Sequence, residues 1–251
     1  MALLDGKVAI VTGAGQGVGR GIALALAGEG ARVVAAGRTY SKVEATVDTI
    51  RARGGDGLAL RCDVGEEPDI LETVKATIQA FGTIDILVNN AQEVPLGRLE
   101  EVSRDQFEAG WRSGPLASFS LMVACRPYLQ DGGVIVNLGT GASFRPDPMG
   151  YGAYAAVKEA TRALTRAAAC EWGPEGIRVL TIVPLASSDA LEGWAASRPE
   201  EASAFFATVP LGRAGDCESD IGRAVVFLCG PDARYITGTT LTIDGGQAFL
   251  G

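Results

Sequence analysis

Hydrophobic residues follow two alternating patterns along the chain. Short runs rich in valine, isoleucine and leucine, such as Ile-Leu-Val at 86–88, are apolar throughout, whereas the longer segments between them carry apolar residues three and four positions apart. Strands that are apolar throughout are expected where helices cover both faces of a parallel sheet. The pattern therefore predicts an α/β fold with a doubly wound sheet.

The same pattern predicts the positions of the elements. Seven strands are expected at 8–11, 32–36, 58–60, 84–88, 134–138, 179–183 and 240–243. Helices are expected at 18–28, 41–53, 68–81, 103–129, 154–172 and 218–228. One long irregular stretch at 184–215 contains Trp194, Phe205 and Phe206 and is expected to form a substrate loop, although a surface excursion without substrate contact is the alternative. We find no repeat or linker, so residues 1–251 are predicted to form a single domain.

Composition limits the possible chemistry. The chain has no histidine, which excludes a Ser/His/Asp triad, a Cys/His dyad and an imidazole-bound metal; no metal site is expected. The net charge of -8 argues against nucleic-acid binding. Neither an apolar leader nor a membrane-length apolar run is visible, and the five cysteines form no CxxC pair. A soluble cytoplasmic protein with reduced thiols and no membrane contact is expected.

The first predicted strand leads into a glycine-rich turn. The segment TGAGQGVG at 12–19 is followed directly by a predicted helix. In such a turn the backbone can approach a pyrophosphate, whose charge is met by the free amides and the dipole at the helix N-terminus. The context indicates a Rossmann-type sheet of seven mainly parallel strands with helices on both faces. The spacing of Gly13, Gly17 and Gly19 is TGxxxGxG instead of GxGxxG.

Several further motifs share one order and spacing with a known family. They are CDV at 62–64, NNAQ at 89–92, YAAVK at 154–158, IRV at 177–179 and ITGTTLTIDGG at 236–246. Together with the glycine-rich turn they resemble the short-chain dehydrogenase/reductase family, in its compact branch, over essentially the whole chain. The resemblance implies a Rossmann fold, a nicotinamide cofactor and a catalytic tyrosine and lysine.

Tyr154 and Lys158 also stand out without the resemblance. Residues four apart on a helix share a face, so the phenol and the ammonium are expected to be neighbours. A nearby cation favours the phenolate and lowers its pKa from about 10 toward the range used in acid/base catalysis. Because histidine is absent, Tyr154 is the leading proton donor and acceptor. Tyr151 has Ala155 at the matching position and is not expected to serve.

The resemblance also implies a serine hydroxyl at the end of the fifth strand. Aligning the strand places Thr140 at that position, whereas counting back from Tyr154 reaches Gly141, so the loop is one residue longer than usual. Thr140 retains a hydroxyl donor and is the first choice. Ser143 is the second choice, and a site that uses neither residue stays open.

Other positions depart from the family pattern. Gly114, followed by Pro115, stands where the resemblance implies an asparagine whose backbone carbonyl positions a water for the lysine. Glycine keeps that carbonyl, and we expect Gly-Pro to break the helix and leave the carbonyl free. Gln92 replaces a glycine, and Leu185 replaces the glycine expected after Pro184. Both are expected beside the nicotinamide half of the cofactor.

The end of the second strand bears on the cofactor. It carries Arg38 and no carboxylate, and an arginine here can hold the 2′-phosphate of NADP, so NADP(H) is preferred over NAD(H); stacking of Arg38 on the adenine is the alternative. The resemblance and the turn together assign these cofactor-binding residues: Gly13, Gly15, Gln16, Gly17, Val18, Gly19, Arg38, Thr39, Asp63, Val64, Asn89, Ala91, Tyr154, Lys158 and Pro184.

These assignments predict hydride transfer between the nicotinamide and a carbonyl or alcohol carbon, on a small molecule with an apolar portion. Tyr154 would deliver the proton, Lys158 would lower its pKa, and Thr140 would donate to the developing alkoxide. Two alternatives remain: a nucleotide-binding protein that senses or scaffolds, and a non-redox lyase or isomerase that uses the same tyrosine. The resemblance further implies a homodimer or homotetramer paired through the helices at 103–129 and 154–172.

Overall fold

One parallel sheet organises the computed structural model, which describes residues 2–129, 132–145 and 149–249. Every pair of neighbouring strands in this sheet runs parallel. The predicted Rossmann-type sheet is therefore confirmed, with all its strands parallel. In sheet order the strands are β3 (Gly57–Arg61), β2 (Arg32–Gly37), β1 (Val8–Thr12), β4 (Ile86–Asn89), β5 (Val134–Leu138), β6 (Arg178–Pro184) and β7 (Thr240–Ile243).

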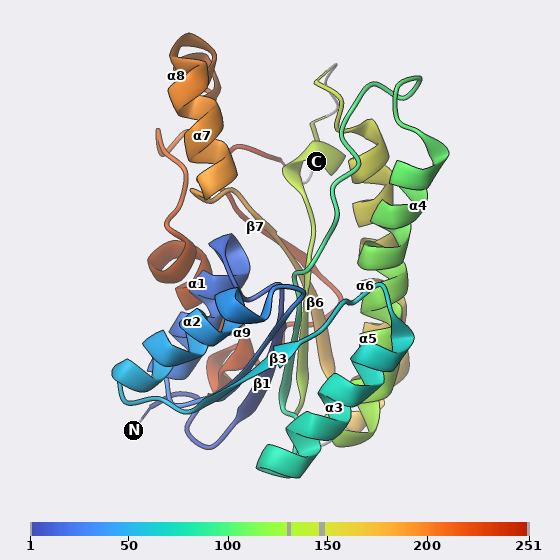
Figure 1. Cartoon of the computed structure of the whole chain (residues 1–251), viewed down its shortest axis with the longest axis vertical. Coiled ribbons are helices and arrows are strands. Elements are labelled where there is room, and N and C mark those ends of the chain that lie inside the picture. Colours follow the sequence, from blue (N-terminus) through green and yellow to red (C-terminus); the bar gives the residue numbers. More distant parts are fainter. Residues whose placement is uncertain (1, 130–131, 146–148, 250–251) are drawn as a thin grey trace.

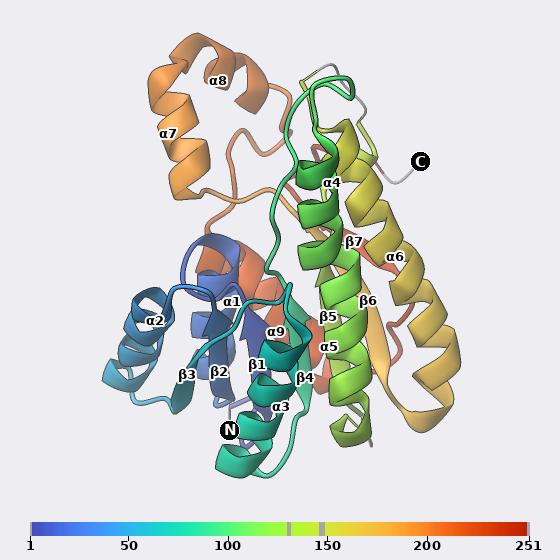
Figure 2. The same ribbon diagram turned by 45° about the vertical axis from the view of Figure 1, so that its right-hand side comes forward.

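Helices cover both faces of the sheet, as Figures 1 and 2 show. One face carries α1 (Gly17–Gly28), α2 (Tyr40–Ala52) and α9 (Arg223–Cys229). The other carries α3 (Glu67–Phe81), α4 (Arg104–Trp111), α5 (Ala117–Cys125) and α6 (Gly152–Trp172). Side chains alternate between the two layers along β1, since Ala9 and Val11 belong to the first core cluster and Ile10 to the second. None of the helices in the described ranges combines the length and hydropathy that a membrane span requires.

Strand order reverses at β1, and this reversal positions the site. The chain builds β2 and β3 on one side of β1 and then returns to place β4 on the other side. In open α/β sheets, ligands bind outside the carboxyl ends of the strands at such a switch point. The turn that contains Gly13 and Gly15 lies directly after β1, at this point.

The helix predicted at 103–129 is interrupted. A π-helical turn at Arg112–Leu116 separates α4 from α5, and a 3-10 turn at Arg126–Tyr128 ends the segment. Pro115 has no N–H to donate to the carbonyl four residues earlier, so the helix widens instead of ending. The N–H of Ala117 donates to the carbonyls of Arg112 and Gly114. The expectation that Gly114 leaves its carbonyl free is therefore wrong.

The segment 184–215, expected to be irregular, contains two helices, α7 (Asp189–Ser197) and α8 (Pro199–Phe206). Ser188 caps α7 by accepting the N–H of Leu191, and Pro199 fits the first turn of α8 because a proline needs no donor there. Trp194 and Phe206 both pack edge-on against Phe205, at centroid distances of 5.7 and 5.5 Å. The aromatic side chains hold the two helices together, and Figure 1 shows this pair standing above the sheet.

Candidate active site

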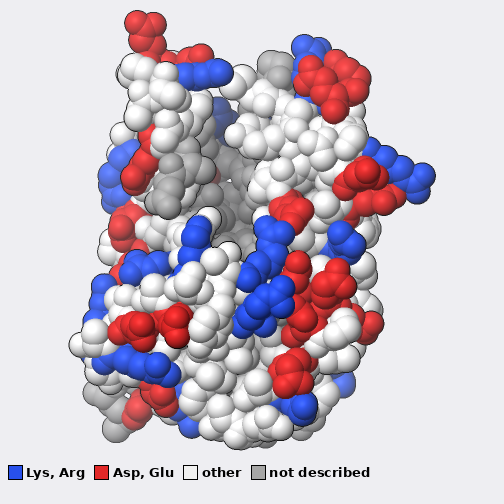
Figure 3. Space-filling view, viewed as in Figure 1, with Lys and Arg blue, Asp and Glu red and all other residues white. Residues whose placement is uncertain are grey.

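A cavity of about 570 Å³ lies at the carboxyl ends of the central strands. Figure 3 shows this face of the molecule hollowed between the part that carries α7 and α8 and the part that carries α4, with acidic and basic side chains mixed around it. Most of the predicted cofactor residues line the cavity: Gly13, Gly15, Gln16, Gly17, Val18, Gly19, Arg38, Thr39, Asp63, Val64, Ala91 and Tyr154.

The glycine-rich turn forms one wall with its backbone. A Cβ on Gly19 would lie 2.4 Å from the carbonyl oxygen of Gly13, and a Cβ on Gly15 would lie 2.7 Å from the Cβ of Lys42. Gly13 also has a φ of +65°, a conformation that side-chain-bearing residues rarely adopt. Only glycine therefore fits here, and the exposed backbone amides at the start of α1 can approach an anion closely.

Asn90 holds this turn against the sheet, a role that the sequence did not reveal. Its Nδ2 donates to the carbonyl of Thr12 at 2.9 Å, and its backbone N–H donates to the Thr12 hydroxyl at 3.0 Å. Asn90 lines the cavity, whereas the predicted residue Asn89 does not. Asn89 is buried in the sheet and donates to Asn137 at 2.8 Å, because alternate residues of a strand point to opposite faces.

Basic side chains gather at the end of β2. Arg38 lines the cavity and forms an ion pair with Glu93, and Lys42 donates to the side-chain oxygen of Gln16 at 2.5 Å. The sequence assignment missed Lys42 and Glu93. Lys42 was detectable, because it lies four residues after Arg38 and the predicted helix begins between them. Glu93 could not be found in this way, because the topology alone brings it near Arg38.

At the other end of the cavity, Tyr154 lies beside Thr140 and Lys158. Tyr154 lies in the first turn of α6, and its hydroxyl is hydrogen bonded to that of Thr140, directly after β5. The ammonium of Lys158 lies 5.7 Å from the centroid of the Tyr154 ring, and Lys158 is only 4% exposed. Ser143 instead directs its hydroxyl to the backbone carbonyl of Ala155 at 3.5 Å. The geometry favours Thr140 over Ser143 as the partner of the tyrosine.

Burial sets the protonation of this group. It raises the pKa of Tyr154 to about 12, although the hydrogen bond from Thr140 acts in the opposite direction. Burial also lowers the pKa of Lys158 to about 7. The expected lowering of the tyrosine pKa by the lysine is not found: desolvation raises that pKa, and the group that lowers it is Thr140, not Lys158. Near neutral pH the tyrosine holds its proton and can donate it.

Comparisons with known proteins agree with this arrangement. The family model described as "Enoyl-(Acyl carrier protein) reductase" matches residues 13–248. A 12alpha-hydroxysteroid dehydrogenase from a Clostridium species is 42% identical over 98% of each chain. The chain belongs to the short-chain dehydrogenase/reductase family. It is an oxidoreductase that uses a nicotinamide cofactor.

Solved members of the short-chain dehydrogenase/reductase family share the fold closely. A short-chain dehydrogenase from Burkholderia cenocepacia in complex with NADP is 32% identical, with a TM-score of 0.90, over 98% of this chain and 99% of that one. A blue fluorescent protein from a metagenomic library, in complex with NADPH, is 33% identical, also with a TM-score of 0.90, over 98% of this chain and all of that one.

Two of the positions that depart from the family pattern, Gln92 and Gly114, lie in contact. A Cβ on Gly114 would lie 2.4 Å from Oε1 of Gln92, so the carboxamide of Gln92 occupies the space that a side chain at 114 would need. Gln92 lines the cavity, whereas Pro184 and Lys158, both predicted to bind the cofactor, do not. Lys158 is buried and does not reach the cavity surface. Pro184 ends β6, which lies farther along the sheet.

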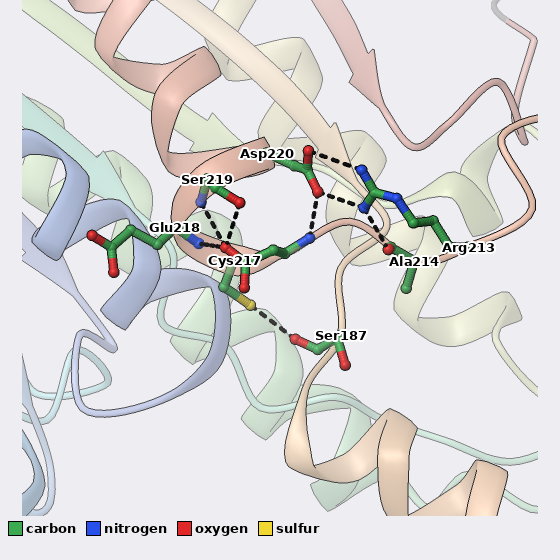
Figure 4. Close-up of polar contacts among 8 residues, drawn as sticks. Ser187, Arg213, Ala214, Cys217, Glu218, Ser219 and Asp220 are labelled. Atoms are coloured by element: carbon green, nitrogen blue, oxygen red, sulfur yellow. Dashed lines mark hydrogen bonds and ion pairs between the residues drawn. The ribbon is translucent and has the colours of Figure 1, made fainter.

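Leu185 lines a second cavity of about 350 Å³ and not the first. Beside it, Arg213 forms an ion pair with Asp220 at 2.6 Å, as Figure 4 shows. The same carboxylate accepts the backbone N–H of Asp216 at 2.7 Å. The thiol of Cys217 contacts the carbonyl of Ser187 at 2.9 Å. These contacts fix both ends of the segment that carries α7 and α8.

Proposed function

We propose that this protein is an NADP(H)-dependent reductase or dehydrogenase that interconverts a carbonyl group and an alcohol, with Tyr154 as the general acid and base. The observation that carries the proposal is the position of Tyr154, which lies in the wall of a cavity that suits a dinucleotide, with Thr140 as its hydrogen-bond partner and the buried Lys158 behind it. Neither histidine nor another acid/base group is needed for the proton transfer.

The residues of the cavity fit the cofactor. Gly13, Gly15 and Gly19 leave a backbone wall that a pyrophosphate can approach, and the wall ends at the positive end of the α1 dipole. Arg38 and Lys42 supply positive charge beside this wall, at the end of β2, which supports a preference for the 2′-phosphate of NADP(H). When bound, the nicotinamide supplies or accepts the hydride.

The chain's own groups handle the oxygen of the substrate. In the direction of reduction, Tyr154 holds a proton at neutral pH and delivers it as the carbonyl oxygen gains charge. Thr140 orients the tyrosine hydroxyl and can donate to the same oxygen. Lys158, with a pKa of about 7, is protonated in about half of the molecules at neutral pH, and in that form its charge stabilises the phenolate left behind.

We further infer that the substrate is a secondary alcohol or ketone on a large apolar ring skeleton, as in hydroxysteroids. The support is the 42% identity with a 12alpha-hydroxysteroid dehydrogenase over nearly the whole of both chains. Turnover of hydroxysteroids, beside small aliphatic and aromatic alcohols, tests this class. A preference for the small alcohols would refute the steroid assignment and leave the proposed reaction intact.

The substitution Tyr154→Phe tests the reaction itself. We expect kcat for NADPH-dependent carbonyl reduction to fall by a factor of at least about 100, because the proton donor is removed, while NADPH binding changes little. Tyr151→Phe is the matched control, because Tyr151 lies just before α6 and does not line the cavity. A Tyr154→Phe enzyme as fast as the wild type would refute the assignment.

We also propose that the protein forms a homodimer or homotetramer. Apolar side chains are exposed along α4, the π-helical turn and α5, among them Trp111, Leu116 and Phe119. A row of this kind marks an interaction surface. Light scattering coupled to size-exclusion chromatography measures the mass directly, and a stable monomer would contradict the proposal.

A further inference from the structure

Glu93 is held at the cavity by its own backbone. Its N–H donates to the hydroxyl of Ser113 at 3.0 Å, and its carbonyl accepts Nε2 of Gln92 at 2.6 Å. Gln92 is fixed in turn by a second bond, from Nε2 to the carbonyl of Gly110 at 2.8 Å. The peptide groups on both sides of the Glu93 Cα are therefore anchored, so its side chain starts from a fixed point at the cavity.

The carboxylate of Glu93 reaches across the cofactor cavity. Arg38 follows β2 directly, and Glu93 follows β4; β1 lies between these two strands in the sheet. The ion pair between Arg38 and Glu93 therefore crosses the end of β1, where the glycine-rich turn begins. Both residues line the cavity, and both remain partly exposed, at 60% and 42% of their side-chain surfaces.

An exposed ion pair of this kind is weak and can exchange partners. Arg38 is the guanidinium that the proposed function assigns to the 2′-phosphate of the cofactor. A phosphate monoester carries nearly two negative charges and binds an arginine in the same forked geometry as a carboxylate. Glu93 and the 2′-phosphate would therefore occupy the same side of one guanidinium, and their like charges repel each other.

We propose that Glu93 is a specificity-determining residue that competes with the 2′-phosphate for Arg38 and so restrains the preference for NADP(H) over NAD(H). This inference rests on the proposed function, because it assumes that the cavity binds these dinucleotides. NAD(H) has a hydroxyl group in place of the phosphate, so it does not need to displace Glu93. A hydroxyl can also donate a hydrogen bond to the carboxylate.

The test measures the Kd of NADPH and of NADH from nicotinamide fluorescence, without substrate. The variants are Glu93→Gln, Arg38→Gln and the two combined; glutamine keeps the shape of the glutamate and removes its charge. Glu100→Gln is the matched control, because it also removes one carboxylate charge, from a pair with Arg98 outside the cavity. A melting temperature for each variant checks that it is folded.

We expect Glu93→Gln to tighten NADPH binding by about tenfold and to change NADH binding by less than about threefold. In the Arg38→Gln background, the gain in NADPH affinity from Glu93→Gln should fall to less than about threefold, because the guanidinium for which Glu93 and the 2′-phosphate compete is no longer there. Glu100→Gln should change neither Kd.

Three results would overturn the inference: weaker NADPH binding by Glu93→Gln, equal tightening for both dinucleotides, or a full gain that persists without Arg38. The proposed function fails differently. If the wild type binds NADPH but reduces no carbonyl compound, the reaction is refuted, while the Kd comparison still decides the role of Glu93. If the wild type binds neither dinucleotide, both proposals are refuted.

Discussion

The two ends of the cavity are built from different parts of the chain. At the glycine-rich turn the wall is backbone, and the groups that a Cβ on Gly19 would meet include the carbonyl of Gly13. At the Tyr154 end the wall is made of side chains from separate segments, among them Gln92 after β4 and Ser113 in the π-helical turn. Thr140, after β5, completes this end by its bond to the tyrosine.

This difference governs how each end tolerates substitution. A backbone atom cannot be exchanged, so a Cβ that meets one has no compensating change nearby. A side chain can be replaced by another that reaches the same space from a different segment, as the carboxamide of Gln92 does beside Gly114. We call the part at the glycine-rich turn the backbone end of the cavity and the part at Tyr154 the side-chain end. The departures from the family pattern at Gln92, Gly114 and Thr140 all lie at the side-chain end.

The largest effect is expected from Gly19→Ala at the backbone end. The new Cβ would lie 2.4 Å from the carbonyl oxygen of Gly13 and equally close to Nδ2 of Asn90, so the turn must move. We expect dinucleotide binding to be abolished and the free energy of unfolding to fall by more than about 3 kcal/mol. Fluorescence titration with NADPH and urea unfolding measure the two effects.

Gly28→Ala is the control on the same helix. It lies at the end of α1, and a Cβ there would meet nothing within 4 Å. We expect unchanged NADPH binding and a gain in stability of up to about 1 kcal/mol, since alanine favours helix more than glycine. If Gly19→Ala behaved like Gly28→Ala, the wall at the turn would not be rigid backbone.

The second prediction concerns the stability cost of the side-chain end. Burial lowers the pKa of Lys158 from 10.5 to about 7, so between these values the unfolded chain binds a proton that the folded chain does not. Stability therefore rises with pH across this window, and the penalty is fully present below it. Lys158→Met removes the penalty, and we expect it to be more stable than the wild type near neutral pH by on the order of 3 kcal/mol.

Urea unfolding at several pH values checks this prediction. The advantage of Lys158→Met should shrink as the pH rises from neutral toward the ordinary pKa of lysine. The series should stay below pH 10, where the unfolded Tyr154 begins to lose its proton while the folded one, with a pKa of about 12, keeps it. An advantage that does not change with pH would mean that packing, and not the buried charge, separates the two proteins.

The backbone end was largely predictable from the sequence. The strand, the glycine spacing and the helix follow one another within 8–28, and glycine requirements are local, so Gly13 and Gly15 could be assigned from their order alone. The fold was equally predictable, because the period of apolar residues sets each element. Lys42 was missed at this end although it lies in the first turn of the helix that follows Arg38.

The side-chain end could not be predicted in the same way. Gln92 and Gly114 are 22 positions apart in the sequence, and their departures from the family pattern did not show that the fold brings the two residues into contact. Asn89 was assigned in place of Asn90 because a motif does not tell which of two neighbours faces the cavity. The helices α7 and α8 were taken for an irregular loop because their apolar residues pack chiefly on each other.

The third prediction separates the two hydroxyls at the side-chain end. Thr140→Ala removes the hydrogen-bond partner of Tyr154, and we expect kcat to fall about a hundredfold, as for the loss of one donor to a developing oxyanion. Ser143→Ala removes only a bond to the carbonyl of Ala155 and should change kcat by less than about threefold. Thr140→Ser should restore most of the activity, and a larger loss from Ser143→Ala would reverse the assignment.

The smallest effect is expected where one side chain replaces another. Gly114→Ala forces a Cβ to within 2.4 Å of Oε1 of Gln92, and we expect a loss of about 2 kcal/mol in the free energy of unfolding. Gln92→Gly also destabilises, because it removes the donor to Glu93 and Gly110. The double variant removes the contact with the carboxamide and leaves the contact with Cγ1 of Val157 at 2.8 Å, so its loss should be smaller than the sum of the single losses by about 1–2 kcal/mol.

The comparison of the two single variants with the double variant depends on Oε1 of Gln92. This atom is buried and accepts no hydrogen bond within the described part of the chain. It therefore crowds a new Cβ at position 114 without making a hydrogen bond that would be lost with it. Gly19→Ala allows no equivalent rescue. Asn90 can be shortened, but the carbonyl of Gly13 stays 2.4 Å from the new Cβ whatever side chains surround it. If the losses of Gly114→Ala and Gln92→Gly simply added, the two ends of the cavity would respond to substitution alike. Coupling at 92 and 114, with none between 19 and 90, would mean that only the side-chain end can be rebuilt by paired substitutions.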